Sequence, residues 1–218
     1  MPRQNLTADQ VLTTTRAVRK RLDLERPLDM TEVRECLEIA LQSPSGSNAQ
    51  GWHFVLVTER EKIAVIADYY RRAFADYEAS PRQPTRLHGD KPAMVETQER
   101  VLSSAQYLAE NLHRVPAMLI PCSSSRADTP GLSLSMIAGM FGSILPATWS
   151  FMLAARERGI GTCWTILHLI YEREVAELLG IPDDYMQVAM TPLAYTLGTD
   201  FRPAPRLPLD DVLHVDGW

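Results

Sequence analysis

The sequence lacks the features that build disulfide frameworks and metal sites. Only three cysteines, Cys36, Cys122 and Cys163, occur among 218 residues, and an odd number of widely spaced cysteines argues against a disulfide scaffold. The five histidines form neither HExxH nor HxH and none neighbours a cysteine, so we expect no metal site. Residues 1–10 lack the apolar core of a signal peptide. We therefore expect a cytoplasmic protein in a reducing compartment.

The common catalytic motifs are also missing. There is no GxxxxGK[ST], no GxGxxG after a strand and no GxSxG. The net charge of −5 does not favour nucleic acid as a partner. No side chain is thus predicted as a catalytic acid, base or nucleophile. This absence is typical of an enzyme that takes its chemistry from a cofactor and supplies binding and orientation.

Charge is absent from residues 129–155, a run long enough to raise the question of a membrane span. Small and polar residues interrupt it at Ser133, Ser135, Gly139, Gly142, Ser143, Pro146, Thr148 and Ser150. We therefore expect a buried helix over 133–158, kinked or broken at its proline and packed against a second subunit, and no contact with a membrane.

Helical and strand patterns alternate along the rest of the chain, which predicts an α/β or α+β protein with one sheet. Helices are expected over 7–14, 29–42, 59–79, 96–113, 133–158 and 172–180, strands over 52–58, 115–122 and 186–198, and a turn and a strand over 159–167. The near-continuous apolar runs over 52–58 and 115–122 predict strands buried inside the sheet. The length fits a single domain over 1–218. Residues 80–92, rich in Pro, Arg and Gly, are expected to form a lid or surface insertion. The proline-rich residues 199–218 are expected to form an extended C-terminal arm.

A basic cluster stands out in this acidic chain. The segment TRAVRKRLD places Arg16, Arg19, Lys20 and Arg21 within six residues. Arginine suits phosphate because its planar fork donates two parallel hydrogen bonds. Taken alone, the cluster is equally compatible with a solvated charged turn.

A second unusual segment is SPSGSNAQGW, residues 43–52, between a helical pattern and an apolar run. Ten residues hold a proline, two glycines, three serines, an asparagine and a glutamine. Such a loop is either a turn that ends the helix or a wrapping for a flat polar ligand, since glycine lets the backbone approach closely.

The ordered motifs TRAVRKRLD, ALQSPSGSNAQGWHFVLVT, LAARERGIGTCW and a basic, proline-containing tail resemble the FMN-dependent nitroreductase family over nearly the whole chain. The resemblance implies an α+β fold, a three-layer sandwich whose central, mostly antiparallel sheet is flanked by helices. It also implies an intertwined homodimer with FMN sites at the shared interface.

Three groups of cofactor-binding residues follow from this resemblance. Arg16 would serve the phosphate and ribityl end of FMN and Arg19 the N1/O2 edge of its ring, while Ala17 replaces the serine of many members. In the tail, Arg206 matches a basic position, with Arg202 as second choice. The partner subunit would contribute Pro44, Ser45, Gly46, Ser47, Asn48 and Gln50. Facing flavin N5, the backbone N–H would come from Thr165, Ile166 or Leu167.

The activity implied by the resemblance is ping-pong oxidoreduction. NAD(P)H would reduce the flavin, and a nitroaromatic, quinone or similar electron-poor acceptor would then take the electrons. Two alternatives stay open: another reaction on the same fold (reductive dehalogenation, flavin fragmentation or dehydrogenation), or flavin binding without turnover.

Overall fold

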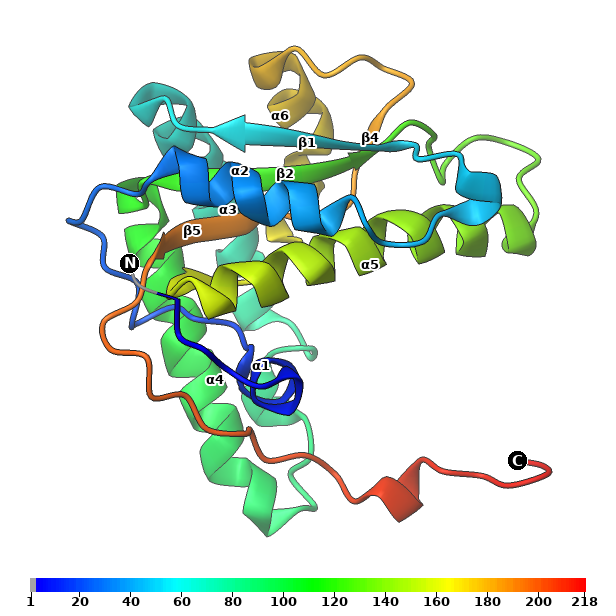
Figure 1. Ribbon diagram of the computed structural model, residues 1–218. Helices are drawn as coiled ribbons and strands as arrows, with labels where there is room; N and C mark the ends of the chain where they lie inside the picture. Colours follow the sequence, from blue (N-terminus) through cyan, green and yellow to red (C-terminus); the bar gives the residue numbers. More distant parts are fainter. Residues whose placement is uncertain (1–2) are drawn as a thin grey trace.

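The computed structural model describes residues 3–218, apart from the side chain of Ala93, and its centre is an antiparallel sheet (Figure 1). The strands are β1 (Trp52–Val57), β2 (Ala117–Ser123), β3 (Ile160–Thr162), β4 (Met186–Gln187) and β5 (Thr191–Tyr195). Their order is β1-β2-β5-β3, and β4 pairs with β2 beyond the end of β5. The named strand pairs are all antiparallel, which confirms the expected α+β sheet.

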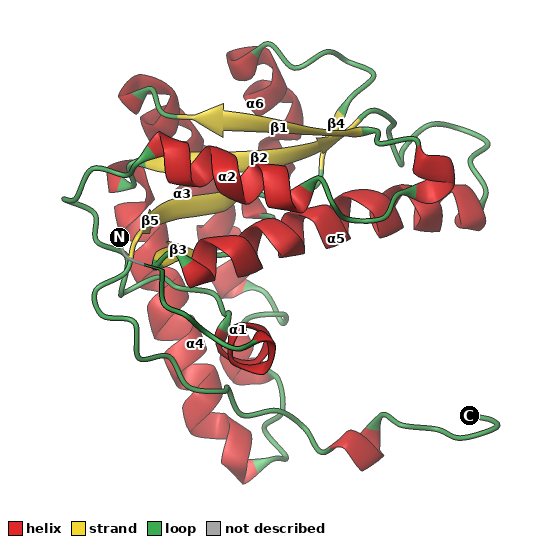
Figure 2. Ribbon diagram, in the orientation of Figure 1, coloured by secondary structure: helices red, strands yellow, loops and turns green. Residues whose placement is uncertain are grey.

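Helices cover both faces of the sheet. They are α1 (Ala8–Thr14), α2 (Met30–Ala40), α3 (Arg60–Ala79), α4 (Pro92–Asn111), α5 (Leu134–Glu157) and α6 (Glu172–Leu179). Figure 2 shows α2 and α5 in front of the strands and α3, α4 and α6 behind them. The expected three-layer arrangement is therefore present within one protomer.

Strand β2 joins the two layers because alternate side chains of a strand point to opposite faces. Met118, Ile120 and Cys122 pack with the α3, α4 and α6 side. Ala117 and Leu119 pack with the α2 and α5 side. The whole strand is buried, so its almost continuous apolar sequence follows from having helices on both sides.

Local signals place several element ends. Thr7 and Gln10 form the predicted capping box at the start of α1. Asp29 caps α2 by accepting a hydrogen bond from the Thr31 N–H. Gly180 ends α6 in the left-handed region with φ 68°, a conformation that glycine adopts without steric cost.

Four boundary predictions are wrong. The helix over Pro146 is neither broken nor split, because Ile144 and Ala147 on either side of it are held in a cluster with Trp52. The strand expected over 186–198 is two short strands. Strand β1 lies at the edge of the sheet with His53 exposed, rather than inside it. Helix α4 begins at Pro92, four residues earlier than expected.

Helix α5 is buried unevenly along its length. Its C-terminal half packs on the sheet, whereas near its N-terminus Leu134 and Met136 are 82% and 58% exposed. Among the described residues it is the one helix long and apolar enough to cross a membrane, a weak signal that core helices also give. The exposed apolar half leaves room for the expected packing against a second subunit, which stays a prediction.

The arginine-rich segment is docked against β3 at a position that only glycine fits. The Val18 N–H donates to the Thr162 carbonyl, and Ala17 forms a parallel bridge with that residue. A Cβ built on Gly161 would lie 2.8 Å from Thr196 Cγ2, 2.9 Å from Leu22 Cδ2 and 3.1 Å from Val18 Cγ1. Such distances are too short for carbon atoms, so this segment can lie where it does because the strand carries no side chain there.

We predict that Gly161→Ala destabilises the fold by about 1–3 kcal/mol, since an extra methyl in a packed interior forces its neighbours to move. The matched control is Gly89→Ala, whose added Cβ meets nothing within 4 Å. Urea denaturation of both variants at fixed protein concentration measures the difference. Equal stability of the two variants would show that the segment shifts freely away from β3.

A buried histidine predicts how stability depends on pH. His168 is fully buried, and burial lowers its pKa to about 3, with the Gln187 side chain opposing the shift. The unfolded chain takes up this proton near pH 6.5 while the folded chain does not, so stability falls as the pH drops below that value. From pH 6.5 to pH 5 the loss from this group is about 2 kcal/mol.

His168→Leu is therefore expected to lose less stability than the parent chain between pH 7 and pH 5, by about that 2 kcal/mol. Urea denaturation at the two pH values gives the difference. The exposed His214→Leu serves as the control. An unchanged pH dependence in His168→Leu contradicts the prediction.

Candidate functional site

A cavity of about 680 Å³ lies between α3, α4 and residues 164–170. This volume is within the usual range for small-molecule and cofactor sites. The wall is mostly aromatic and aliphatic, with a few polar groups; it includes Arg19, Tyr70, Phe74, Tyr77, Ser80, Arg82, Val101, Trp164, Thr165, Ile166 and Leu167. Four predicted residues, Arg19 and the three from 165–167, are therefore brought together.

Arg19 enters this cavity with part of its guanidinium unpaired. Its Nη1 donates to Ser104 Oγ at 3.2 Å, while its Nε is buried and has no partner among the described residues. A buried donor without an acceptor costs free energy, so such groups usually mark a position that a ligand or water fills. Arg19 is thus suited to an acceptor bound in the cavity.

The three candidates for a backbone donor differ in availability. The Thr165 N–H already donates to the Met190 carbonyl at 3.0 Å, and the Met190 N–H donates back at 2.8 Å. Within residues 3–218 no acceptor is seen for the N–H of Ile166 or Leu167. Ile166 and Leu167 are therefore the two candidates whose backbone N–H is available to a ligand. The Thr165 hydroxyl donates to Tyr70 Oη.

A positive region lies beside the cavity, on the same segment. Burial lowers the pKa of Arg16, and the nearby charges of Arg206 and Arg100 lower it further. The Nη1 of Arg16 donates to the Arg202 carbonyl at 2.7 Å, so tail and segment are in direct contact. Arg16, Arg100 and Arg206 are three cations close enough together to suit an anion. Of the two predicted tail arginines, Arg206 brings its charge to this cluster and Arg202 its backbone carbonyl.

The other predicted group, residues 44–50, lies elsewhere in the protomer. This loop sits against the N-terminal half of α5, where the Gly46 N–H donates to Ser143 Oγ (Figure 1). The arginine segment lies near the other end of α5, where Arg156 donates to Thr14. Thirteen residues of α-helix separate these anchors, or about 20 Å. One protomer therefore does not bring its loop and its arginines to a single small ligand.

The loop is open to solvent and unusually shaped. Ser47, Asn48 and Gln50 have φ of 51°, 52° and 51°, and all three are exposed. Non-glycine residues in this region carry strain and cluster at ligand-binding sites. Ser45 Oγ accepts from the Gln50 N–H at 3.1 Å, which fixes the turn.

The family assignment now follows from comparison with known proteins. The model of the nitroreductase family matches residues 12–195, more than four-fifths of the chain. This chain belongs to the nitroreductase family. Sequence identity to a 4-nitrobenzoate reductase of Nocardioides sp. (strain LMS-CY) is 28% over 207 residues, which covers 86% of this chain and 79% of that protein.

Solved nitroreductase-like structures share the fold. The FMN- and NADPH-dependent nitroreductase NfnB of sphigopyxis sp. strain HMH superposes with a TM-score of 0.71 at 23% identity, covering 98% of this chain and all of that one. An oxidised iodotyrosine deiodinase bound to FMN and 3-iodo-L-tyrosine superposes with a TM-score of 0.62 at 20% identity, covering 94% and 96%. At these identities the likeness establishes the fold.

The residues of this chain fit FMN on two observations of their own. The unpaired Nε of Arg19 suits the carbonyl-rich edge of the flavin ring, and the cations around Arg16 suit a phosphate. The three cysteine thiols are not reactive groups, because burial raises their pKa values. The pKa of Cys163 is raised, and the pKa values of Cys36 and Cys122 are each raised to about 12.

Sequence reasoning missed the residues that complete this candidate site from α3 and α4. Ser103 and Ser104 hold Lys20 and Arg19, and Arg100 approaches Arg16. Tyr70 keeps its proton because burial raises its pKa to about 12. Only the apolar spacing of α3 and α4 signalled that one face of each helix turns inward; no motif marks these residues.

We predict that Arg19→Gln weakens FMN binding by about 10- to 100-fold, the effect of losing a charged hydrogen bond worth ~1.5–3 kcal/mol. Flavin fluorescence titration of the apoprotein measures it. The matched control is Arg34→Gln on the exposed face of α2, with folding checked by thermal melting of both variants. Parent-like affinity in Arg19→Gln would remove this side chain from the site.

Proposed function

We propose that this chain is a cytoplasmic, homodimeric, FMN-dependent oxidoreductase that uses NAD(P)H to reduce nitroaromatic, quinone or similar electron-poor acceptors. The observation that carries the proposal is the cavity in which Arg19 leaves a buried donor unpaired beside the free backbone donors of residues 166 and 167. The named activities of the 4-nitrobenzoate reductase and of NfnB support the reaction class.

Dimerisation is proposed because one protomer separates the two halves of the expected site. The arginines lie at one end of α5 and the loop over 44–50 at the other. A second copy, packed against the exposed apolar half of α5, would bring its loop to the first copy's arginines. The exposed arm over 199–218, with Leu209, Val215 and Trp218 open to solvent, supplies further apolar surface for that contact.

In this mechanism the bound flavin supplies hydride transfer, and the protein supplies position and charge. Arg19 would bind the edge of the ring where negative charge develops on reduction, and its fixed positive charge there would favour the reduced state. Arg16, Arg206 and Arg202 would hold the phosphate end. The N–H of Ile166 or Leu167 would donate to N5, and the proposal assigns no side chain as a catalytic acid, base or nucleophile.

The aromatic wall of the cavity, formed by Tyr70, Phe74, Tyr77 and Trp164, suits a flat acceptor. Ser80, Arg82 and Pro84 belong to the same wall, so the segment over 80–92 is placed to set the choice of acceptor. Its movement as a lid stays a prediction.

A second candidate function is reductive dehalogenation on the same flavin. The fold shared with a deiodinase that binds FMN and an iodotyrosine favours it, and the cavity's polar groups Asp76 and Arg82 could bind a charged substrate. Measuring which acceptor reoxidises the reduced flavin separates this candidate from the first. A third possibility, a flavin-binding protein without activity, would show no turnover with either acceptor.

Purified protein is expected to show flavin absorption bands that bleach when NAD(P)H is added under nitrogen and return when a nitroaromatic compound is added. Slow return with the nitroaromatic and fast return with an aryl halide would favour the second candidate. Absence of bleaching with both nicotinamide donors would contradict the oxidoreductase proposal.

We also predict that Met136→Glu, on the exposed face of α5, shifts the protein from dimer to monomer and weakens FMN binding, although the residue lies far from the arginines. Sedimentation velocity and flavin titration on the same samples measure both effects. The control is Val65→Glu, a substitution of an equally apolar, partly exposed residue on α3. A monomeric variant that keeps full FMN affinity would show that one protomer forms the site alone.

A further inference from the structure

Arg156 is a buried cation that forms no ion pair with a carboxylate among the described residues. The residue is 7% exposed and lies in the last turn of α5. Its Nε donates to Thr14 Oγ1 at 3.3 Å and its Nη2 to the Thr199 carbonyl at 3.0 Å. Its Nη1 is buried and has no partner among the described residues. Burial lowers the pKa of this guanidinium, and the nearby Arg21 adds to the shift while Glu157 opposes it.

The carbonyls at the helix end that would ordinarily satisfy such a cation are hydrogen-bonded to other groups. Carbonyls in the last turn of a helix attract positive charge. Here the Ala154 carbonyl accepts from Arg158 Nη1, and those of Ala155 and Arg156 accept from the N–H groups of Arg158 and Gly159. The Glu157 carbonyl accepts from the Gln4 N–H, and the Glu157 carboxylate from the N–H groups of Asn5 and Leu6. Each of these carbonyls thus has a donor already, and none of them accepts from Nη1 among the described residues.

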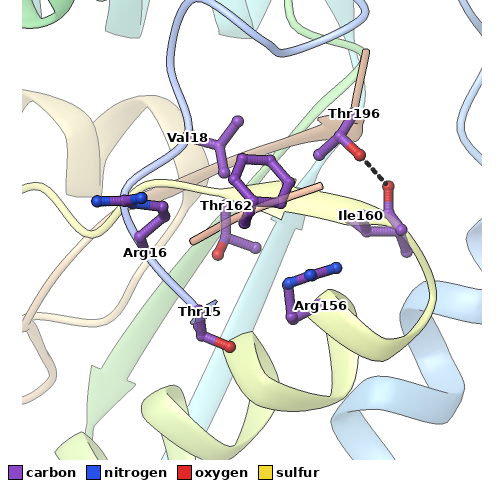
Figure 3. Close-up of a pocket in the computed structure, with 10 residues that line it drawn as sticks. Thr15, Arg16, Val18, Arg156, Ile160, Thr162 and Thr196 are labelled. Atoms are coloured by element: carbon purple, nitrogen blue, oxygen red, sulfur yellow. Dashed lines mark hydrogen bonds between the residues drawn. The ribbon is translucent and has the colours of Figure 1, made fainter. Parts of the chain in front are cut away.

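A small cavity borders Arg156 (Figure 3). Its volume is about 10 Å³, close to the least that a single water-sized occupant needs. Its wall contains two arginines, three threonines and no carboxylate: Thr15, Arg16, Val18, Arg156, Gly159, Ile160, Gly161, Thr162, Thr196 and Phe201. Figure 3 shows Arg16 and Arg156 on opposite sides of this group.

The threonines do not neutralise the cavity. The Thr15 hydroxyl donates to the Val11 carbonyl and the Thr196 hydroxyl to the Gly159 carbonyl. Phe201 also borders the cavity and lies against cations, with the Cζ atoms of Arg21 and Arg156 at 4.2 Å and 5.0 Å from its ring centroid. A buried, unbalanced positive charge is costly, and a small negative ion beside it removes that cost better than a neutral water does.

We propose that this cavity is a binding site for one small monoatomic anion of the chloride class, held by Nη1 of Arg156. The volume excludes phosphate, sulfate and carboxylates. This anion would be separate from the phosphate of FMN, which the outward-facing Arg16 and the tail arginines are placed to hold.

Occupancy of the site would stabilise the tail anchor. Arg156 binds the Thr199 carbonyl and packs on Phe201, and the next residue, Arg202, supplies the carbonyl that orients Arg16. An anion that fixes Arg156 thus fixes the start of the arm and, through it, the region expected to hold the phosphate.

A bromide soak tests the site directly in the unmodified, FMN-saturated protein. The expected result is an anomalous peak within hydrogen-bonding distance of Arg156 Nη1. A water molecule or a cofactor atom at that position overturns the proposal. A bromide peak in the crystal without any effect of halide on the melting temperature identifies an adventitious ion only, and this result also overturns the proposal.

The solution measurement is the melting temperature in sodium chloride against sodium gluconate at equal ionic strength. At tenfold the dissociation constant of the anion, chloride is expected to raise the melting temperature by roughly 3–5 °C. Arg156→Gln should melt at the same temperature in both salts, while Arg34→Gln should keep the difference. Because the parent protein itself is compared in two salts, a folding defect in Arg156→Gln does not obscure the result. Equal melting of the parent protein in the two salts overturns the proposal.

Discussion

The site depends on a short stretch of backbone that binds along the edge of the sheet. The Val18 N–H donates to the Thr162 carbonyl, the Asp23 N–H to the Tyr195 carbonyl, and the Leu197 N–H to the Arg21 carbonyl. Val18 and Leu22 turn into the core at 6% and 2% exposure. Because these anchors fix the backbone on both sides, the side chains of Arg16, Arg19 and Arg21 start from fixed positions at the sheet edge. A flexible loop with the same residues would not hold these side chains in place.

Some of this arrangement could be predicted from sequence because the determining interactions are local. Capping groups at Thr7 and Asp29 and the left-handed Gly180 lie within a few residues of the ends they define. The sequence of β2 does not alternate between apolar and polar residues, and its continuous apolar run correctly indicated a strand with helices on both faces. The same reasoning misplaced β1, because an apolar strand at an edge has the same composition as one in the middle until its neighbours are known.

Other parts of the site depend on contacts between distant segments, to which a single sequence gives no access. Ser104 lies 85 positions from Arg19 in the sequence, and no sequence motif distinguishes it from other serines in helices. It nevertheless accepts a hydrogen bond from the Arg19 guanidinium at the cavity. His168 sits beside three candidate residues, but its burial against Gln187 follows from the closure of α6 on the sheet. Pro146 was expected to kink or break a helix, yet α5 runs through it without a break, and its neighbours are held by tertiary packing.

Helix α5 connects the two unusual parts of the molecule, since it carries the loop over 44–50 near one end and Arg156 near the other. Its length keeps these groups about 20 Å apart in one protomer. If each ligand needs both groups, then cofactor binding and assembly are linked, because a ligand that binds only the dimer stabilises the dimer by mass action. The strained loop and the positively charged end of α5 are then the two groups that the length of α5 keeps apart in one protomer. In the proposed dimer each protomer would hold an incomplete site with unpaired polar groups, and the free energy of pairing them would be released only when the second protomer and the cofactor bind together.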